Sequence, residues 1–328
     1  MHTGRICFTT LLLLWIAAVP VRGQTCSCAG APLISSQSSG ASSAGNFLLG
    51  LTYEHHEISN LYNEDRSLDD ENDTRNTRSL LLEIHYGITN RLSISGTFSH
   101  VGKDRTTGRQ FSGGGQTVST SGIGDGVFLL RYIIHPQSIW EQYHLAVGAG
   151  AKVPFGTTSL TRQGLALNMD MQPGTGAWDG VGWSYASVSF LPHTTMNLFW
   201  SNSFRYTGSA ERFQINDRYS FGNEWVSDLG VNNTLTGNLS WILQLRYRSS
   251  SSDRINDGIQ PNTGGKWLYL QPRINYAFTD LVSMQVGGRI PLYQNVNGTQ
   301  PTSTYAISGT LFLNFNSNES VFIYANKN

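Results

Sequence analysis

The sequence predicts an all-β chain, a transmembrane antiparallel up-and-down β-barrel of about 12 strands of the bacterial outer-membrane type. Three observations lead to this prediction. Polar and apolar residues alternate with a period of two in segment after segment, long and short connections alternate between the segments, and an export signal precedes them. Only 13% of the 328 residues are charged, well below the roughly 25% of ordinary soluble domains.

The export signal occupies residues 1–23 and has the pattern of a secretory signal peptide. Arg5 precedes the apolar run 11–19, and short residues lie near a cleavage point before Gln24. The run is much shorter than the roughly 20 residues that a helix needs to cross a bilayer. No later window offers such a helix, so we expect an exported protein that is either soluble or a barrel in the outer membrane.

The alternating segments are the expected strands, and each is long enough for the roughly 9–11 tilted residues that cross a membrane. In 91–101, for example, Leu92, Ile94 and Phe98 alternate with serine and threonine. A soluble β-sandwich would show a similar alternation and is the alternative fold. The expected strands lie at 45–57, 76–87, 91–101, 122–135, 141–154, 178–190, 194–206, 219–231, 235–248, 266–278, 281–292 and 303–315.

The connections between these segments favour the barrel over the sandwich. An outer-membrane barrel has short turns at one end and long loops at the other. Aromatic residues such as Tyr53, Tyr206 and Phe315 end several segments, where a barrel carries its interfacial girdles. Short turns are expected at 88–90, 135–140, 191–193, 232–234 and 279–280, and long loops at 58–75, 102–121, 155–177, 207–218, 249–265 and 293–302.

The barrel domain is therefore expected to span 45–315. A flexible N-terminal segment, 24–44, precedes it and contains Cys26 and Cys28, and a C-terminal tail, 316–328, follows it. Two cysteines in the mature chain are too few for a disulfide framework. They are interpreted as a solvated pair, with a metal or redox role as the alternative.

If the apolar residues face lipid, the polar residues of the same strands face the interior. Arginines and carboxylates would pair across a narrow interior, because an unpaired charge in a poorly hydrated space is costly. Two interpretations stay open, a selectivity path for a solute and a set of braces in a plugged barrel. The residues expected to set selectivity are Glu83, Asp125, Arg131, Lys152, Arg205, Arg246, Arg273 and Arg289. Other expected interior residues are Glu54, His85, His144, Glu224, Asp228 and Arg248.

Other functional classes find little support in the sequence. Lys+Arg and Asp+Glu both number 22 and the formal net charge is zero, so nucleic acid is not an expected partner. No G-x-S-x-G elbow and no H-E-x-x-H motif occurs, so we expect no enzyme, no catalytic residue, no cofactor and no metal site. The acidic first loop, with Asp65, Asp69 and Asp73, matches no calcium-loop pattern and is interpreted as solvated.

Three glycine-rich stretches carry a family resemblance. They are Gly122-Ile-Gly-Asp125, the run from Gly148 to Gly156 (GAGAKVPFG), and the run from Pro173 to Asp179 (PGTGAWD). In this order and spacing, the chain resembles the outer-membrane barrels of the MetA-pathway of phenol degradation family. The resemblance implies a barrel that passes small compounds, aromatic or hydrophobic ones among them.

These observations together predict a porin-like channel or transporter in the outer membrane of a Gram-negative bacterium. It would pass small solutes passively, aromatic or hydrophobic ones among them. Its expected partners are outer-membrane lipid, a small-molecule solute and the barrel-insertion machinery. The alternative is a non-conducting surface barrel whose long loops serve adhesion or bind an ion or a partner.

Overall fold

The computed structural model describes residues 44–69, 73–108, 115–136, 142–190, 195–211 and 217–315. The predicted signal peptide, the two cysteines of the mature chain and the predicted C-terminal tail lie outside these residues. Among the described residues, no helix is long and apolar enough to span a bilayer.

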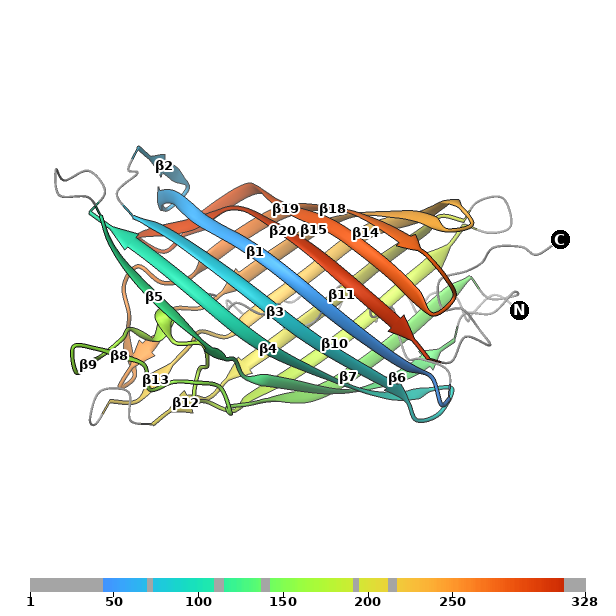
Figure 1. Cartoon of the computed structure of the whole chain (residues 1–328), viewed down its shortest axis with the longest axis horizontal. Coiled ribbons are helices and arrows are strands. Elements are labelled where there is room, and N and C mark those ends of the chain that lie inside the picture. Colours follow the sequence, from blue (N-terminus) through green and yellow to red (C-terminus); the bar gives the residue numbers. More distant parts are fainter. Residues whose placement is uncertain are drawn as a thin grey trace, which may run out of the picture.

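The described chain forms a closed barrel of twelve antiparallel strands (Figure 1), which confirms the predicted fold class. Each strand pairs with its neighbour along the chain, and the first pairs with the last, so the barrel has no open edge. The barrel strands are β1 (Phe47–Asn63), β3 (Thr74–Gly87), β4 (Leu92–Thr107), β6 (Gly126–His135), β7 (Tyr143–Val153), β10 (Asp179–Ser189), β11 (Asn197–Thr207), β14 (Glu224–Thr236), β15 (Leu239–Ser250), β18 (Gly265–Ala277), β19 (Val282–Val296) and β20 (Thr299–Asn314).

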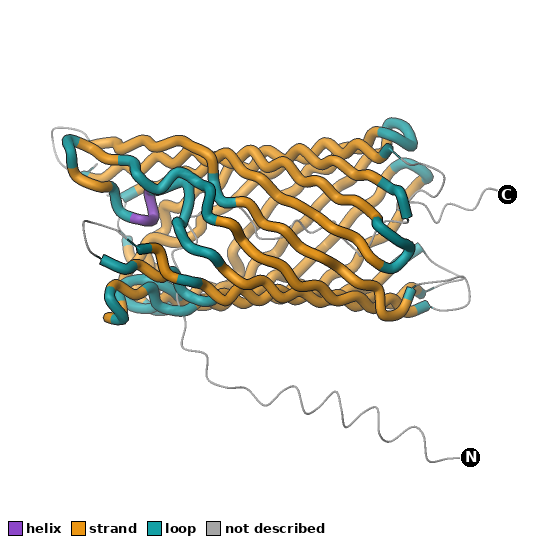
Figure 2. The backbone as a smooth tube through the Cα atoms, turned by 90° about the horizontal axis from the view of Figure 1, so that it is seen from below, coloured by secondary structure: helices purple, strands orange, loops and turns teal. Residues whose placement is uncertain are grey.

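Short elements gather at one end of the barrel, which we call the mouth (Figures 1 and 2). The long loops meet there, as the sequence predicts. One of these elements, β5, pairs with the mouth end of β4, and β6 pairs with the rest of β4. The predicted strand 122–135 is therefore interrupted at Gly124 and Asp125, which lie between β5 and β6. The short elements are β2 (Arg66–Leu68), β5 (Gln116–Ile123), β8 (Thr161–Arg162), β9 (Leu165–Ala166), η2 (Met169–Met171), β12 (Ser209–Ala210), β13 (Tyr219–Ser220), β16 (Arg254–Ile255) and β17 (Gly258–Ile259).

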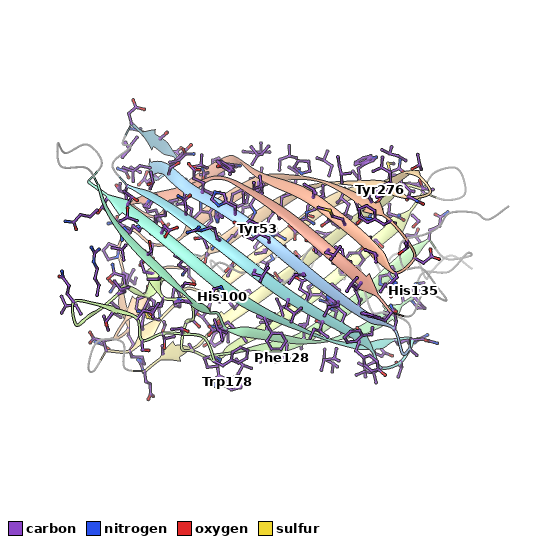
Figure 3. The ribbon with its side chains drawn as sticks, in the orientation of Figure 1. Tyr53, His100, Phe128, His135, Trp178 and Tyr276 are labelled. Carbon is purple, nitrogen blue, oxygen red and sulfur yellow. The ribbon has the colours of Figure 1, made fainter. Side chains whose placement is uncertain are left out.

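Side chains alternate between the outer and inner faces of each strand. On β1, Leu51 and Tyr53 are exposed on the outer face, whereas Thr52 and Glu54 are buried inside. Figure 3 shows large side chains projecting from the outer face around the barrel, Tyr53 and Tyr276 among them. An apolar outer face on a closed sheet is what hydrocarbon requires, because every backbone group is already paired within the sheet.

Two predicted connections are wrong. Strand β14 runs to Thr236, so its turn to β15 lies at Gly237 and Asn238 and not at 232–234. The predicted long loop 293–302 is instead the tight turn Asn297-Gly298 between β19 and β20. Gly298 has a φ of 71°, in the left-handed region that glycine adopts without steric cost. Both errors arise because polar residues in these two stretches belong to strand ends that extend beyond the apolar alternation.

Candidate functional site

The charged residues predicted to line the interior do lie there. Their side chains are mostly buried and alternate with exposed apolar neighbours along each strand. Each one is part of a barrel strand except Asp125, which lies at the break between β5 and β6. The structure thus places the eight predicted selectivity residues on the inner side of the barrel, and their role in selectivity stays a prediction.

A chain of ion pairs crosses neighbouring strands on the mouth side of the interior. Lys152 lies 3.0 Å from both Asp125 and Asp179, and Arg205 lies 3.9 Å from Asp179 and 2.7 Å from Glu224. Glu224 also accepts a hydrogen bond of 2.9 Å from Arg248. Each charge in this mouth-side chain is buried, and its desolvation is offset by these ion pairs together with hydrogen bonds from neighbouring groups. One member of this chain, Asp179, was not predicted from the sequence.

Two more ion pairs lie deeper in the interior. Arg246 holds Asp228 with two hydrogen bonds of 2.7 and 2.9 Å, the geometry in which a guanidinium binds a carboxylate most strongly. Arg289 donates a 3.1 Å hydrogen bond to Glu54. The sequence analysis placed all four residues inside, but their pairing depends on the register of the strands.

Three of the predicted residues have no ion pair with an Arg, Lys, Asp or Glu side chain in the described part of the chain. Arg131 lies over the ring of Trp183, 4.9 Å from its centroid. Arg273 donates a 2.8 Å hydrogen bond to Gln271. Glu83 is buried with no hydrogen-bond partner for either carboxylate oxygen among the described residues, and the imidazole of His85 lies 3.9 Å away.

The three glycine-rich stretches meet at Asp125. Its carboxylate accepts hydrogen bonds from the backbone N–H of Gly156 at 3.1 Å and of Thr175 at 2.9 Å, in addition to the Lys152 ammonium. Gly156 and Gly174 are in such close contact that a Cβ on either would lie 2.7 Å from the backbone of the other. Glycine is thus required at both positions by the approach of two backbones. Asp125 fastens the loop after β7 to the barrel wall.

One part of the interior is apolar, which the sequence analysis did not predict. The rings of Trp183 and Tyr185 on β10 and of Phe199 on β11 lie nearly parallel inside the barrel. The ring centroid of Tyr185 is 6.0 Å from that of Trp183 and 6.3 Å from that of Phe199. We call these three residues the aromatic wall. Gly148 and Gly230 on adjacent strands leave room for the rings, because a Cβ there would lie 3.3 Å from Trp183 and 2.5 Å from Phe199.

Neighbouring strands extend this apolar surface. Val127, Leu129 and Ile133 on β6 are buried with the aromatic wall in one hydrophobic cluster. The outer face of β6 is apolar too, with Leu130 and Tyr132 exposed. The rule that apolar side chains face lipid is therefore wrong for this sector of the barrel, where both faces are apolar.

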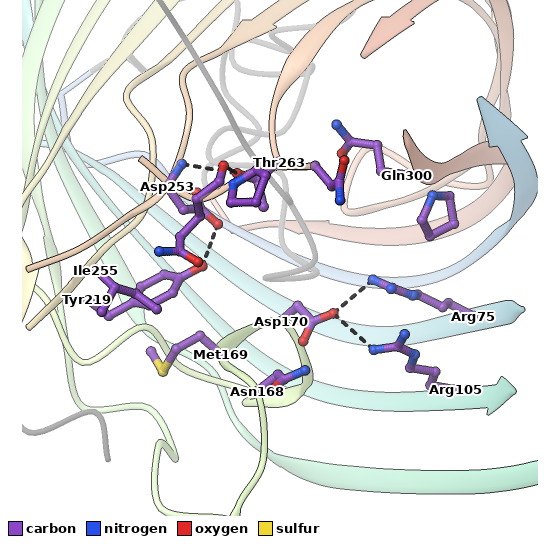
Figure 4. A pocket seen from close by; sticks show the side chains of 14 residues that line it. Arg75, Arg105, Asn168, Met169, Asp170, Tyr219, Asp253, Ile255, Thr263 and Gln300 are labelled. Carbon is purple, nitrogen blue, oxygen red and sulfur yellow. Dashed lines mark hydrogen bonds and ion pairs between the residues drawn. The ribbon is translucent and has the colours of Figure 1, made fainter. Parts of the chain in front are cut away.

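A pocket of about 280 Å³ lies at the mouth (Figure 4). On one side, Arg75 and Arg105 lie 2.8 and 4.0 Å from the same oxygen of Asp170. On the other, the Tyr219 hydroxyl donates a 2.5 Å hydrogen bond to Asp253. The mouth pocket is lined by Arg75, Arg105, Asn168, Met169, Asp170, Tyr219, Asp253, Ile255, Gln260, Pro261, Asn262, Thr263, Gln300 and Pro301.

Burial raises the pKa of Asp253 to about 6, because a low-dielectric environment disfavours the charged carboxylate. Hydrogen bonds from Tyr219 and from the Gly222 backbone act in the opposite direction. Burial and the neighbouring carboxylate raise the pKa of Tyr219 above its ordinary value. Within the described ranges, no three His, Cys, Asp or Glu side chains come together as metal ligands.

The fold has counterparts among solved structures. The COG4313 outer membrane channel from Pseudomonas putida F1 matches with a TM-score of 0.68 at 14% identity, over 86% of this chain and all of that one. The NanC porin matches with a TM-score of 0.47 at 11% identity, over 81% of this chain and 98% of that one. The CymD monoaromatic hydrocarbon channel has a TM-score of 0.43 at 10% identity, over 91% and 99% of the two chains.

No protein-family model matches the sequence, and no curated protein matches it as a relative. At 14% identity, the match with the TM-score of 0.68 establishes the fold. The chain is thus a β-barrel of the outer-membrane type, and its exposed apolar outer face is what such a barrel presents to lipid.

Proposed function

We propose that the protein is a passive outer-membrane channel for small solutes, aromatic or hydrophobic ones among them. The observation that carries this proposal is the interior itself, which combines paired charges such as Arg246 and Asp228 with the aromatic wall. A barrel interior that served only as a packed core would not need buried charges, each of which is costly to desolvate. The resemblance to the MetA-pathway of phenol degradation family supports the same class of solute.

We assign selectivity to the eight interior residues predicted from the sequence. The mouth-side chain of ion pairs would be met first by a solute that enters from the loops, and the Arg246–Asp228 and Arg289–Glu54 pairs would follow. Alternating charges along a path let a polar solute exchange one partner for the next.

Conductance of the purified mature protein in a planar lipid bilayer tests the proposal. We expect discrete channel currents, and a shift of the reversal potential towards cation preference in the Arg246→Ala/Arg273→Ala variant, because two interior positive charges are lost. Lys266→Ala, which removes a charge from an exposed position on β18, should leave selectivity unchanged. Absence of current from a protein that shows the heat-dependent gel mobility of a folded barrel would refute the channel.

The mouth pocket favours a second candidate, a non-conducting barrel that displays its loops to bind a ligand. Its lining comes from six separate stretches of chain, including Arg75, Asp170, Asp253 and Gln300. This candidate predicts no current in the bilayer experiment. Arg75→Ala, which alters the lining of the pocket, would separate the two, since a channel should retain its conductance without this side chain.

A further inference from the structure

Arg273 is the centre of an uncompensated positive charge inside the barrel. Its charged neighbours are Arg246, Arg289, Asp228 and Glu54. Both carboxylates are already held by the other two arginines. Three guanidinium groups thus share two carboxylates, and no carboxylate of the described chain lies within ion-pair distance of Arg273. A buried surplus charge of this kind is costly unless an anion accompanies it.

Hydrogen-bond donors around Arg273 are also without partners. Arg273 Nη1 has none among the described residues, and the same is true of the side-chain nitrogens of Gln244 on β15 and Gln285 on β19. Gln244 is only 1% exposed. Neither the nitrogen nor the oxygen of its side-chain amide has a hydrogen-bond partner, so the nitrogen lacks a partner in either orientation of the amide. Buried polar groups are nearly always bonded in folded proteins, and an anion would satisfy these donors.

The strand register brings these donors together. Arg273 lies opposite Gly287 on β19, where a Cβ would be 2.6 Å from Arg273 Cγ, so the glycine leaves room for the arginine side chain. Gln285 is two residues from Gly287 on the same strand and faces the same side. Gln271, which accepts a hydrogen bond from Arg273, lies opposite Gln244.

An apolar surface begins beside the guanidinium group. Ile242 on β15 lies opposite Arg273 and packs against the hydrophobic cluster that contains the aromatic wall. Ile242 is half-buried, so a ligand whose anionic group is bound at Arg273 would place its apolar body against this side chain. Water could bond to the donors, but it would neither balance the charge nor bury apolar area.

We propose that the interior holds a carboxylate-binding site centred on Arg273 that takes small aromatic carboxylates. A guanidinium group binds a carboxylate through two parallel hydrogen bonds, and the ring of the ligand would pack on Ile242, at the edge of the hydrophobic cluster. This inference rests on the proposed function, because a ligand must enter the interior to reach Arg273. It defines the solute class more narrowly than the proposed function does.

Calorimetric titration of the detergent-solubilised mature protein with sodium benzoate, sodium acetate and benzyl alcohol tests the site. Benzoate is expected to bind about tenfold more tightly than acetate, which lacks the ring, and more tightly than benzyl alcohol, which lacks the charge. Arg273→Gln should weaken benzoate binding by about tenfold or more. Lys266→Gln, the matched loss of charge from an exposed position on the same strand, should leave binding unchanged.

The apolar half of the site has its own test. Ile242→Ser should weaken benzoate binding and leave acetate binding nearly unchanged, and the heat-dependent gel shift shows that each variant is folded. Equal affinity for benzoate and acetate would overturn the proposal, as would unchanged benzoate binding in Arg273→Gln. Failure of the channel proposal would look different, because benzoate would still bind to Arg273 while the bilayer showed no current.

Discussion

The Lys152 ammonium on β7 donates a 3.0 Å hydrogen bond to Asp125, which lies at the break between β5 and β6. Asp125 also accepts hydrogen bonds from the backbone of Gly156 and Thr175. One carboxylate therefore holds three glycine-rich segments that lie far apart in the sequence.

Asp125→Ala is expected to loosen the segment 154–177 without unfolding the barrel. Lys152 keeps Asp179 as a partner, so the main loss is of hydrogen bonds to a buried charge, about 1.5–3 kcal/mol each. Hydrogen exchange of the Gly156 and Thr175 amides should become faster. As a control, Asp257→Ala removes a carboxylate whose side chain is 77% exposed, and it should change nothing there, because exposed ion pairs contribute little.

The Asp253 carboxyl should make the mouth loops sensitive to pH. Its pKa of about 6 in the folded protein exceeds the roughly 3.9 of an unfolded chain, so the folded state binds this proton more tightly. Local stability is therefore highest below about pH 4, falls by up to about 3 kcal/mol as pH rises to about 6, and is constant above that.

Hydrogen exchange of residues 251–263, corrected for the intrinsic effect of pH on exchange, measures this dependence. Asp253→Asn keeps the shape of the side chain and should remove the change between pH 4 and 6. The same pH dependence in the Asn variant would mean that another group titrates in the mouth.

The turn at Gly298 should tolerate no side chain. Its φ of 71° disfavours any other residue, and a Cβ would lie 2.4 Å from Asn262 Oδ1, which accepts a hydrogen bond from the Thr299 backbone. Gly298→Ala is expected to lower the free energy of unfolding by about 1–2 kcal/mol. Gly237→Ala, in a turn with nothing within 4 Å of the added Cβ, should be nearly neutral, and urea unfolding in lipid vesicles compares the two.

The lipid-facing band can be tested by the same substitution at two exposed leucines. Leu245 lies in the middle of β15, on the outer face. Leu245→Arg should lower the free energy of unfolding in vesicles by about 2–4 kcal/mol. Leu165→Arg, on the short strand β9 at the mouth, should have little effect. Equal costs at the two positions would contradict the assignment of the outer face to lipid.

Local pattern was sufficient to predict the strands and most inward positions. A period of two places alternate side chains on opposite faces of any strand, so Glu54, Arg246 and Arg289 could be placed inside the barrel from the sequence. The same logic failed where both faces are apolar. On β6 neither Leu129 nor Leu130 carries a polarity signal, and only closure of the barrel decides which of them meets lipid.

By itself, the sequence determined that the chain alternates like a membrane barrel and that its polar half turns inward, because these properties depend on residues two positions apart. The tertiary structure decided which charges pair and which do not. Arg246 meets Asp228 because the turn lies at Gly237 and Asn238 and a β-bulge between Thr234 and Thr236 shifts the register by one residue. Arg273 keeps a surplus charge because both nearby carboxylates are paired with other arginines. Such partnerships depend on register between strands, and register is fixed by turns and by closure, which no single segment contains.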